Sequence, residues 1–263
     1  MTGYLRFDGD RATEADAEAH TPELTGQRAH LRLLLALRPG ERVLDAGCGP
    51  GYLLEEMARE IGPDGVLRGV DVSPSMLDLA RRRCGGDGRV GLEEGRCEEL
   101  PFPDGSFDAV VSSQVLEYVE DVEGALAEFA RVLRPGGRVV ILDTDWDSLV
   151  WHSRDRARMR HVLRLWDDHV ADPRLPERLG PLLAGAGLRE ERLTTLTFVN
   201  RDCHPGVYSH WQLGFVEAFL AGHPEADPET TSAWGDEQRE LARAGRFFYS
   251  LGRYAFTAVR PAG

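Results

Sequence analysis

Three glycines and two aspartates occur at a spacing that could bind a nucleotide-like cofactor. The glycines follow a short apolar run and are Gly47, Gly49 and Gly51. Glycine allows a tight turn and a close approach of the backbone to a ligand at a helix N-terminus. Asp45 precedes them, and Asp71 ends the next apolar run, where a carboxylate can accept hydrogen bonds from two ribose hydroxyls.

A dinucleotide site is one alternative, and the spacing argues against it. The NAD fingerprint requires a small residue at position 52, where the chain packs closely on the preceding strand, and this sequence has Tyr52. That fingerprint also has no aspartate two residues before the first glycine, where this sequence has Asp45. These residues disfavour a nicotinamide-dependent dehydrogenase.

Four segments together resemble the class I S-adenosylmethionine-dependent methyltransferase family. They are VLDAGCGPGYL (43–53), GVDVSPSML (69–77), EGRCEELPFPDGSFDAVVSSQVLEYVED (94–121) and RVLRPGGRVVILD (131–143). The resemblance covers roughly residues 25–145 and is highly specific in combination. It implies S-adenosyl-L-methionine as cofactor and methyl transfer as the reaction.

The same resemblance implies roles for individual residues. Asp45 and the backbone of Gly47 and Gly49 would hold the methionine part of the cofactor. Asp71 would bind the ribose hydroxyls, and Met76 would lie against the adenine.

Further positions follow from the later family motifs. The backbone of Cys97 and Glu98 would meet the adenine edge, and the carbonyl of Ser113 would face the cofactor's amino group. Gln27 and Arg28 would approach its carboxylate. The family commonly has an aspartate at position 96 that accepts from the adenine amino group; here position 96 is arginine, so backbone, Glu98 or apolar packing must recognise the adenine.

The acceptor is expected near two segments, because ligands bind outside the carboxyl ends of the strands in a doubly wound sheet. The segments are 113–118 and 143–152. The second is rich in carboxylates and tryptophans, and it is either an aromatic wall with a base or an ordinary loop before a helix. Candidates for the base are Asp145 and His152; candidates for acceptor binding are Glu117, Trp146, Trp151 and His210.

The reaction does not depend on a strong base. Positioning of reactants can supply on the order of 7–11 kcal/mol, whereas a general base typically gives about 3–5 kcal/mol. The acceptor atom, whether oxygen, nitrogen, sulfur or carbon, therefore stays open.

From about residue 40, short apolar runs alternate with amphipathic segments, which predicts a doubly wound, Rossmann-like α/β fold with a mostly parallel seven-stranded sheet. Strands are expected at 42–45, 66–72, 89–93, 107–111, 139–142, 192–200 and 254–259. A loop joins the third and fourth of these strands, helices separate the others among the first five, and further helices are expected at 154–170 and 177–186. Two further helices, near 207–221 and 232–251, precede the last strand.

Three parts of the chain are expected. Residues 1–24 form an acidic N-terminal arm that orders over the site, and residues 25–200 with 253–263 form the cofactor-binding domain. Residues 201–252 form a helical cover over the acceptor, to which 154–170 contributes. Such long connections are usually functional or partly disordered.

Composition limits the chemistry and the partners. The chain contains no lysine, which excludes a Schiff base or a phosphate-gripping lysine. Its 31 basic and 44 acidic residues give a net charge of −13, which disfavours nucleic acid and anionic membranes. The four cysteines form no CxxC pair, so no metal site is predicted, although Cys203, His204 and His210 could supply ligands.

The N-terminal residues are polar and acidic and do not resemble a signal or transit peptide, so a cytoplasmic location is expected, with a homodimer left open. The leading hypothesis is methyl transfer to a small organic acceptor, a biosynthetic intermediate. A cofactor-binding enzyme or regulator that does not methylate is the alternative.

Overall fold

Seven strands form one sheet in the order β3-β2-β1-β4-β5-β7-β6. The computed structural model describes residues 10–262. The strands are β1 (Arg42–Ala46), β2 (Val66–Asp71), β3 (Val90–Glu94), β4 (Phe107–Ser113), β5 (Leu133–Trp151), β6 (Arg189–Asn200) and β7 (Tyr249–Val259). The first five run parallel, and β7 is antiparallel to both β5 and β6. The predicted fold class is confirmed.

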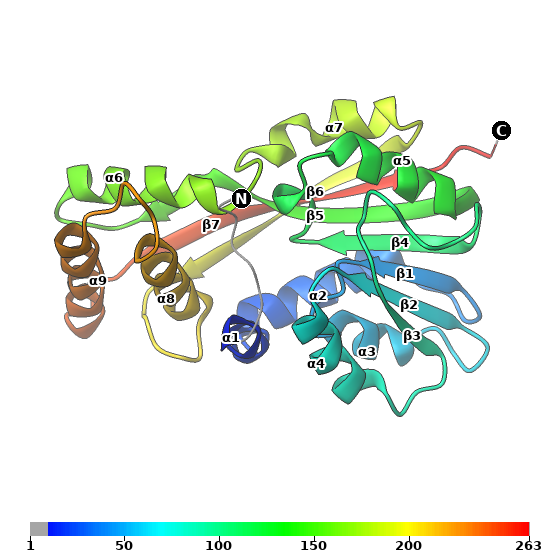
Figure 1. The fold of residues 1–263 in the computed structure, drawn as a ribbon, viewed down its shortest axis with the longest axis horizontal. Helices are drawn as coiled ribbons and strands as arrows, with labels where there is room; N and C mark the ends of the chain where they lie inside the picture. The colour runs from blue at the N-terminus through cyan, green and yellow to red at the C-terminus, as the bar shows by residue number, and fades with distance from the viewer. Residues whose placement is uncertain (1–9, 263) are drawn as a thin grey trace.

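Helices cover both faces of this sheet (Figure 1). One face carries α2 (Pro22–Leu35), α3 (Tyr52–Ala58) and α4 (Pro74–Cys84); the other carries α5 (Val122–Val132) and α7 (Leu175–Gly185). Their buried apolar side chains form two separate cores. Local sequence fixes their starts: Ser73 accepts a hydrogen bond from Met76 N at the start of α4, and Asp121 accepts one from Gly124 N at the start of α5.

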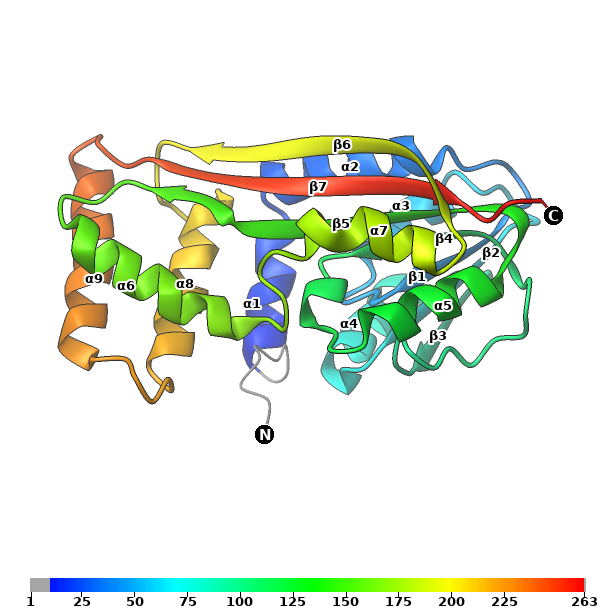
Figure 2. The same ribbon diagram turned by 90° about the horizontal axis from the view of Figure 1, so that it is seen from above.

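A second group of helices lies beyond the end of β4, where β5, β7 and β6 continue (Figure 2). We call it the helical lobe: α6 (Arg156–Trp166), α8 (Tyr208–Leu220), α9 (Pro228–Arg243) and the adjoining ends of the three long strands. It has its own core, in which Trp151 packs edge-on against Trp234 and Tyr249. The remaining helix, α1 (Asp10–Glu18), contacts α4 and α8.

Two predicted boundaries differ most from the structure. Residues 143–151 are strand rather than loop, because their backbone pairs with β7, from Asp143↔Tyr254 to Trp151↔Tyr249, across an irregularity between Asp145 and Val150. The helix expected at 232–251 ends at Arg243, and residues 249–251 of that expected helix instead form the start of β7. Both errors arise from pairing between segments about 100 residues apart.

Within the described residues, no helix combines the length and hydropathy needed to span a membrane.

Candidate active site

The loop 47–51, between β1 and α3, presents its backbone at the carboxyl end of the sheet. We call it the glycine loop. Its three glycines have φ of +80°, +50° and +81°. Gly47 N and Cys48 N donate to Val70 O at 2.7 and 3.0 Å, which ties the loop to β2. A Cβ on Gly47 would lie 2.2 Å from a methyl of Val115, so only glycine fits between the loop and the segment after β4.

Asp71 lies beside this loop, as its position at the end of β2 requires. One carboxylate oxygen accepts a hydrogen bond from Gly49 N at 2.8 Å, and the other accepts one from Ser73 N at 2.9 Å. The side chain is therefore held in a fixed orientation beside the glycine loop. Each carboxylate oxygen can accept more than one hydrogen bond.

Asp45 is buried, with 2% of its surface exposed, at the end of β1. Burial, with a smaller contribution from the negative charge of Asp71, raises its pKa to about 8. Its Oδ2 atom has no hydrogen-bond partner among the described residues. A buried acceptor without a donor is costly, and a cationic ligand above the glycine loop would satisfy it.

The other predicted cofactor residues lie around the same edge of the sheet. Met76 and Cys97 are buried, and burial raises the pKa of the Cys97 thiol, with contributions from nearby acids that include Asp71 and Asp45. Glu98 is half-buried, and Arg96 pairs with it at 2.5 Å. The arginine at position 96 is thus directed onto a carboxylate.

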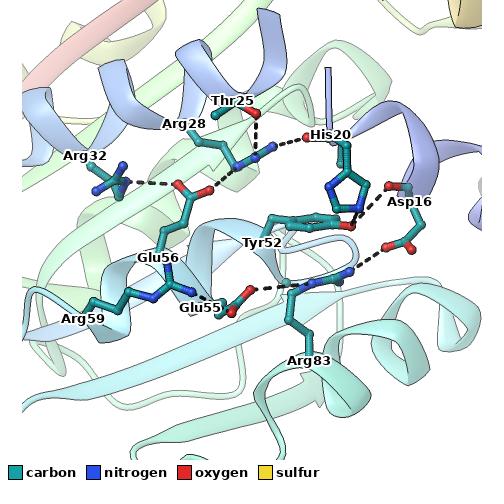
Figure 3. Close-up of polar contacts among 12 residues, drawn as sticks. Asp16, His20, Thr25, Arg28, Arg32, Tyr52, Glu55, Glu56, Arg59 and Arg83 are labelled. Carbon is teal, nitrogen blue, oxygen red and sulfur yellow. Dashed lines mark hydrogen bonds and ion pairs between the residues drawn. The ribbon is translucent and has the colours of Figure 1, made fainter. Parts of the chain in front are cut away.

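Ser113, at the end of β4, accepts a hydrogen bond from Gln27 Nε2 at 3.1 Å. Arg28 points elsewhere: its guanidinium donates to Glu56 at 2.8 Å and to Ala19 O at 2.8 Å (Figure 3). Of these two residues, Gln27 contacts the end of β4, whereas Arg28 is engaged by α3 and by the turn after α1. Arg28 is therefore not proposed as a cofactor-binding residue.

Tyr52, the first residue of α3, contacts residues of α1 and of the turn after it (Figure 3). Residues 1–9 of the predicted N-terminal arm lie outside the described residues. The Arg83 guanidinium lies 3.4 Å from the centre of the Tyr52 ring and donates to Asp16 of α1 at 2.8 Å. Arg83 also donates to the carbonyl of Pro50 in the loop itself. The Tyr52 hydroxyl lies 2.7 Å from His20 Nε2. The residue that argues against a dinucleotide site therefore connects α1 to α3 and α4.

On the acceptor side, the structure brings Glu117, Asp143 and Trp146 together. Glu117 Oε2 accepts from Thr144 N at 3.1 Å and from Trp146 Nε1 at 3.3 Å. Asp143 Oδ1 accepts from Val115 N at 3.0 Å, while its Oδ2 has no partner in residues 10–262. Burial raises the pKa of Glu117 to about 7 and that of Asp143 well above its usual value.

The remaining candidates from the sequence form no hydrogen bond with Glu117 or Asp143 among the described residues, although Trp151 shares a hydrophobic core with Trp146. Asp145 accepts from Asp147 N and interacts with charges at the start of α7. Trp151 is in the core of the helical lobe, and His152 is exposed beyond the end of β5. His210 lines a groove of about 570 Å³ between α8, α9 and α1.

Three buried polar residues near the site were not predicted from the sequence: Glu18, Tyr208 and Arg253. Arg253 Nη2 donates to the Tyr208 hydroxyl at 2.6 Å, and Nη1 donates to Gln27 Oε1. The sequence did hold one signal. Alternate residues of the last strand, Tyr249, Leu251 and Ala255, are buried, and an arginine at position 253 shares their face.

Comparison with known proteins identifies the domain around this site. Residues 44–141 match a family model described as a methyltransferase domain. The chain carries a class I S-adenosylmethionine-dependent methyltransferase domain. This methyltransferase domain contains the glycine loop, Asp45 and Asp71.

Individual proteins are similar over different lengths. A 37.1 kDa protein of transposon TN4556 from Streptomyces fradiae is 38% identical over 197 residues, which span 73% of this chain and 56% of that protein. The demethylmenaquinone methyltransferase of Symbiobacterium thermophilum is 39% identical over 109 residues, spanning 40% of this chain and 43% of that enzyme. The chain thus spans about half the length of these relatives.

Among solved structures, phosphoethanolamine N-methyltransferase 2 of Haemonchus contortus, in complex with S-adenosyl-L-methionine, has a TM-score of 0.62. It is 20% identical, and the match covers 96% of this chain and 57% of that one. This likeness shows a shared fold.

The site fits the family's cofactor. S-adenosylmethionine carries an ammonium group and a sulfonium, both positive. The buried Asp45 oxygen without a donor is a partner suited to such a cation, and the positive φ of the glycine loop leaves its backbone open to close approach. In the described part of the chain, no three or more histidine, cysteine or acidic side chains form a group that could hold a metal ion.

Proposed function

We propose that this protein transfers a methyl group from S-adenosylmethionine to a small organic acceptor. The observation that carries the proposal is the buried, unpartnered carboxylate oxygen of Asp45 beside the glycine loop of a methyltransferase domain. When bound, the cofactor supplies a methyl group already activated by a positively charged sulfur.

The chain's own residues have distinct tasks in this proposal. Asp45 accepts hydrogen bonds from the ammonium group, and the backbone of Gly47 and Gly49 borders the methionine part. Asp71 binds the ribose hydroxyls, and its fixed orientation by Gly49 N supports that role. Met76, Cys97, Glu98 and Ser113 border the adenine and the amino group, as the family pattern implies.

The acceptor would bind between the cofactor and the helical lobe, next to Glu117 and Trp146. Its orientation is the larger catalytic contribution, because positioning outweighs a general base by several kcal/mol. Where the acceptor must lose a proton, we propose Glu117 as the group that takes it, because its pKa of about 7 suits proton transfer near neutral pH. Asp145 and His152 are second choices, because Asp145 accepts from Asp147 N and His152 is exposed beyond the end of β5.

A small-molecule acceptor is supported by the charge of −13, which opposes binding of a polyphosphate backbone. It is also supported by α1 and the turn after it, where Asp16 and His20 contact Arg83 and Tyr52 beside the glycine loop. The alternative is a protein that binds the cofactor without methylating, and the labelling experiment below distinguishes the two.

Calorimetric titration with S-adenosylhomocysteine tests the cofactor part. The wild type should bind, and Asp71→Ala should weaken binding at least about 30-fold, because two hydrogen bonds to a charged acceptor are lost. Asp78→Ala, an exposed α4 aspartate paired only with Arg81 among the described residues, is the matched control and should bind as the wild type does.

Incubation with methyl-labelled cofactor and a small-molecule cell extract tests the transfer. Label in a low-molecular-weight product, absent with Asp71→Ala, supports the proposal. Tight cofactor binding without labelled product would favour the non-methylating alternative, and absence of binding would overturn the proposal.

A further inference from the structure

Strand β7 runs from the helical lobe into the methyltransferase domain (Figures 1 and 2). Arg253 is a buried cation in the middle of this strand, between Leu251 of the lobe core and Phe256 of the domain core. Only 2% of its surface is exposed. Its strand neighbours are Thr144 on β5 and Leu196 on β6. The guanidinium lies 4.5 Å from the centre of the Phe198 ring and 4.8 Å from that of Tyr208.

The hydrogen-bond partners of Arg253 are neutral. They are the amide oxygen of Gln27 and the hydroxyl of Tyr208, and Nε has no partner among residues 10–262. Other arginines that are largely covered pair directly with carboxylates, such as Arg138 with Glu41 and Arg158 with Glu237. A buried charge is costly unless it is paired. Arg253 therefore has the electrostatics of an anion-binding group.

Three acids lie within electrostatic range of Arg253 and do not hydrogen-bond to it: Glu18, Glu117 and Asp143. Burial raises the pKa of Glu18 to about 8 and that of Glu117 to about 7 despite the nearby guanidinium. Their carboxyl groups are thus partly neutral near pH 7, and they leave the charge of Arg253 incompletely balanced.

The environment of Arg253 is connected to the cofactor side of the site. Gln27 accepts from Arg253 and donates to Ser113, which borders the proposed cofactor position. Tyr208 accepts from Arg253 and donates to Gln212 at 2.9 Å. The Gln212 amide nitrogen is buried without an acceptor in the described chain, so a second donor is available beside the guanidinium.

We propose that the Arg253 guanidinium, held in place by Gln27 and Tyr208, binds an oxyanion of the methyl acceptor, and that acceptors are therefore organic acids with an apolar body. The planar guanidinium donates two parallel hydrogen bonds to a carboxylate. Phe198 and Tyr208 supply the apolar surroundings. This inference rests on the proposed function, and it adds the acceptor's charge to it.

The test compares acids with their uncharged amides. Benzoate, cinnamate and decanoate, each with the corresponding amide, are titrated into the protein saturated with S-adenosylhomocysteine. At least one acid should bind 10-fold or more tightly than its amide. Arg253→Met should abolish that preference, and Arg253→Lys should retain part of it, because the charge remains without the planar fork.

Arg192→Gln is the matched control, because it removes a positive charge from an exposed position on the neighbouring strand β6 and should keep the preference. Binding of S-adenosylhomocysteine by Arg253→Met, measured in parallel, reports that the variant is folded and should change less than threefold.

Two results would overturn the inference while leaving the proposed function intact. In one, no acid is preferred over its amide by a wild-type protein that binds S-adenosylhomocysteine. In the other, Arg253→Met binds S-adenosylhomocysteine more than 10-fold more weakly while remaining folded, which would assign Arg253 to the cofactor's own carboxylate. A wild type that binds no S-adenosylhomocysteine but prefers an acid through Arg253 would overturn the proposed function alone.

Discussion

The methyltransferase domain and the helical lobe position their polar groups in different ways. In the domain, short parallel strands end at one edge, and Asp45 and Asp71 occupy the last positions of β1 and β2, just before the turns that follow these strands. At the lobe, long strands continue past that edge, and helices from elsewhere in the chain supply the partners of Arg253. The proposed cofactor site is thus built from residues close in sequence, whereas the proposed acceptor site is built from segments far apart.

The largest effect is expected within the glycine loop. Gly47→Ala should weaken S-adenosylhomocysteine binding at least about 100-fold, because a positive φ and a clash with Val115 together cost about 3 kcal/mol. Calorimetry measures the affinity. Gly40→Ala, at φ +85° but with open space around the added Cβ, controls for backbone strain and should leave affinity unchanged. Equal binding by both variants would remove the glycine loop from the cofactor site.

The next prediction separates the stability of the lobe from cofactor binding. Trp234 is fully buried in the lobe core, so Trp234→Ala should lower the free energy of unfolding by about 3–5 kcal/mol, measured by urea denaturation. The affinity of the folded variant for S-adenosylhomocysteine should stay within about threefold.

Val150→Ala, at an exposed position of the same lobe, is the control and should change stability by less than about 0.5 kcal/mol. If Trp234→Ala lost cofactor affinity as well as stability, the domain and the lobe would form one energetic unit. The separation between the two regions would then be wrong.

The pH dependence of cofactor binding should report Asp45. Its pKa of about 8 means that the carboxyl is mostly protonated at pH 6, whereas a cation binds the ionised form. Binding therefore releases a proton, and affinity should rise about tenfold per pH unit up to pH 8 and then level off. Calorimetry between pH 6 and 9, in buffers of different ionisation enthalpy, measures the affinity and the number of protons released on binding. In Asp45→Asn, any remaining binding should lose this dependence; an unchanged profile would assign it to another group.

The smallest effect concerns the contact of α1 with the glycine loop side. Tyr52→Phe removes the hydroxyl that meets His20, a loss of about 1 kcal/mol. S-adenosylhomocysteine should dissociate about fivefold faster, as measured by stopped-flow displacement. His20→Ala should have a similar effect through the other partner. Unchanged dissociation in both variants would show that α1 does not control access to the cofactor.

The methyltransferase domain and the helical lobe also differ in how well their site residues could be predicted from the sequence. Asp45 and Asp71 could be placed from one short segment each, because a strand followed by a tight turn fixes where the next side chains lie. Arg28 was expected to approach the cofactor's carboxylate, and the structure pairs it with Glu56 of α3. The position of Arg28 in the sequence did not indicate whether its guanidinium would lie closer to the cofactor or to Glu56. The extension of β5 was missed because its partner β7 arrives from a distant part of the sequence.

The sequence by itself determined the order of strands and helices, the glycine loop and the two aspartates, because these depend on residue periodicity and on turns that span a few residues. Only the tertiary structure decided which buried polar groups gather at the proposed acceptor position. Glu18, Tyr208 and Arg253, which the sequence did not indicate, come from three separate elements and lie near Gln27 and Glu117. Their burial, and the raised pKa values of the acids among them, exist only once those elements pack together and exclude water.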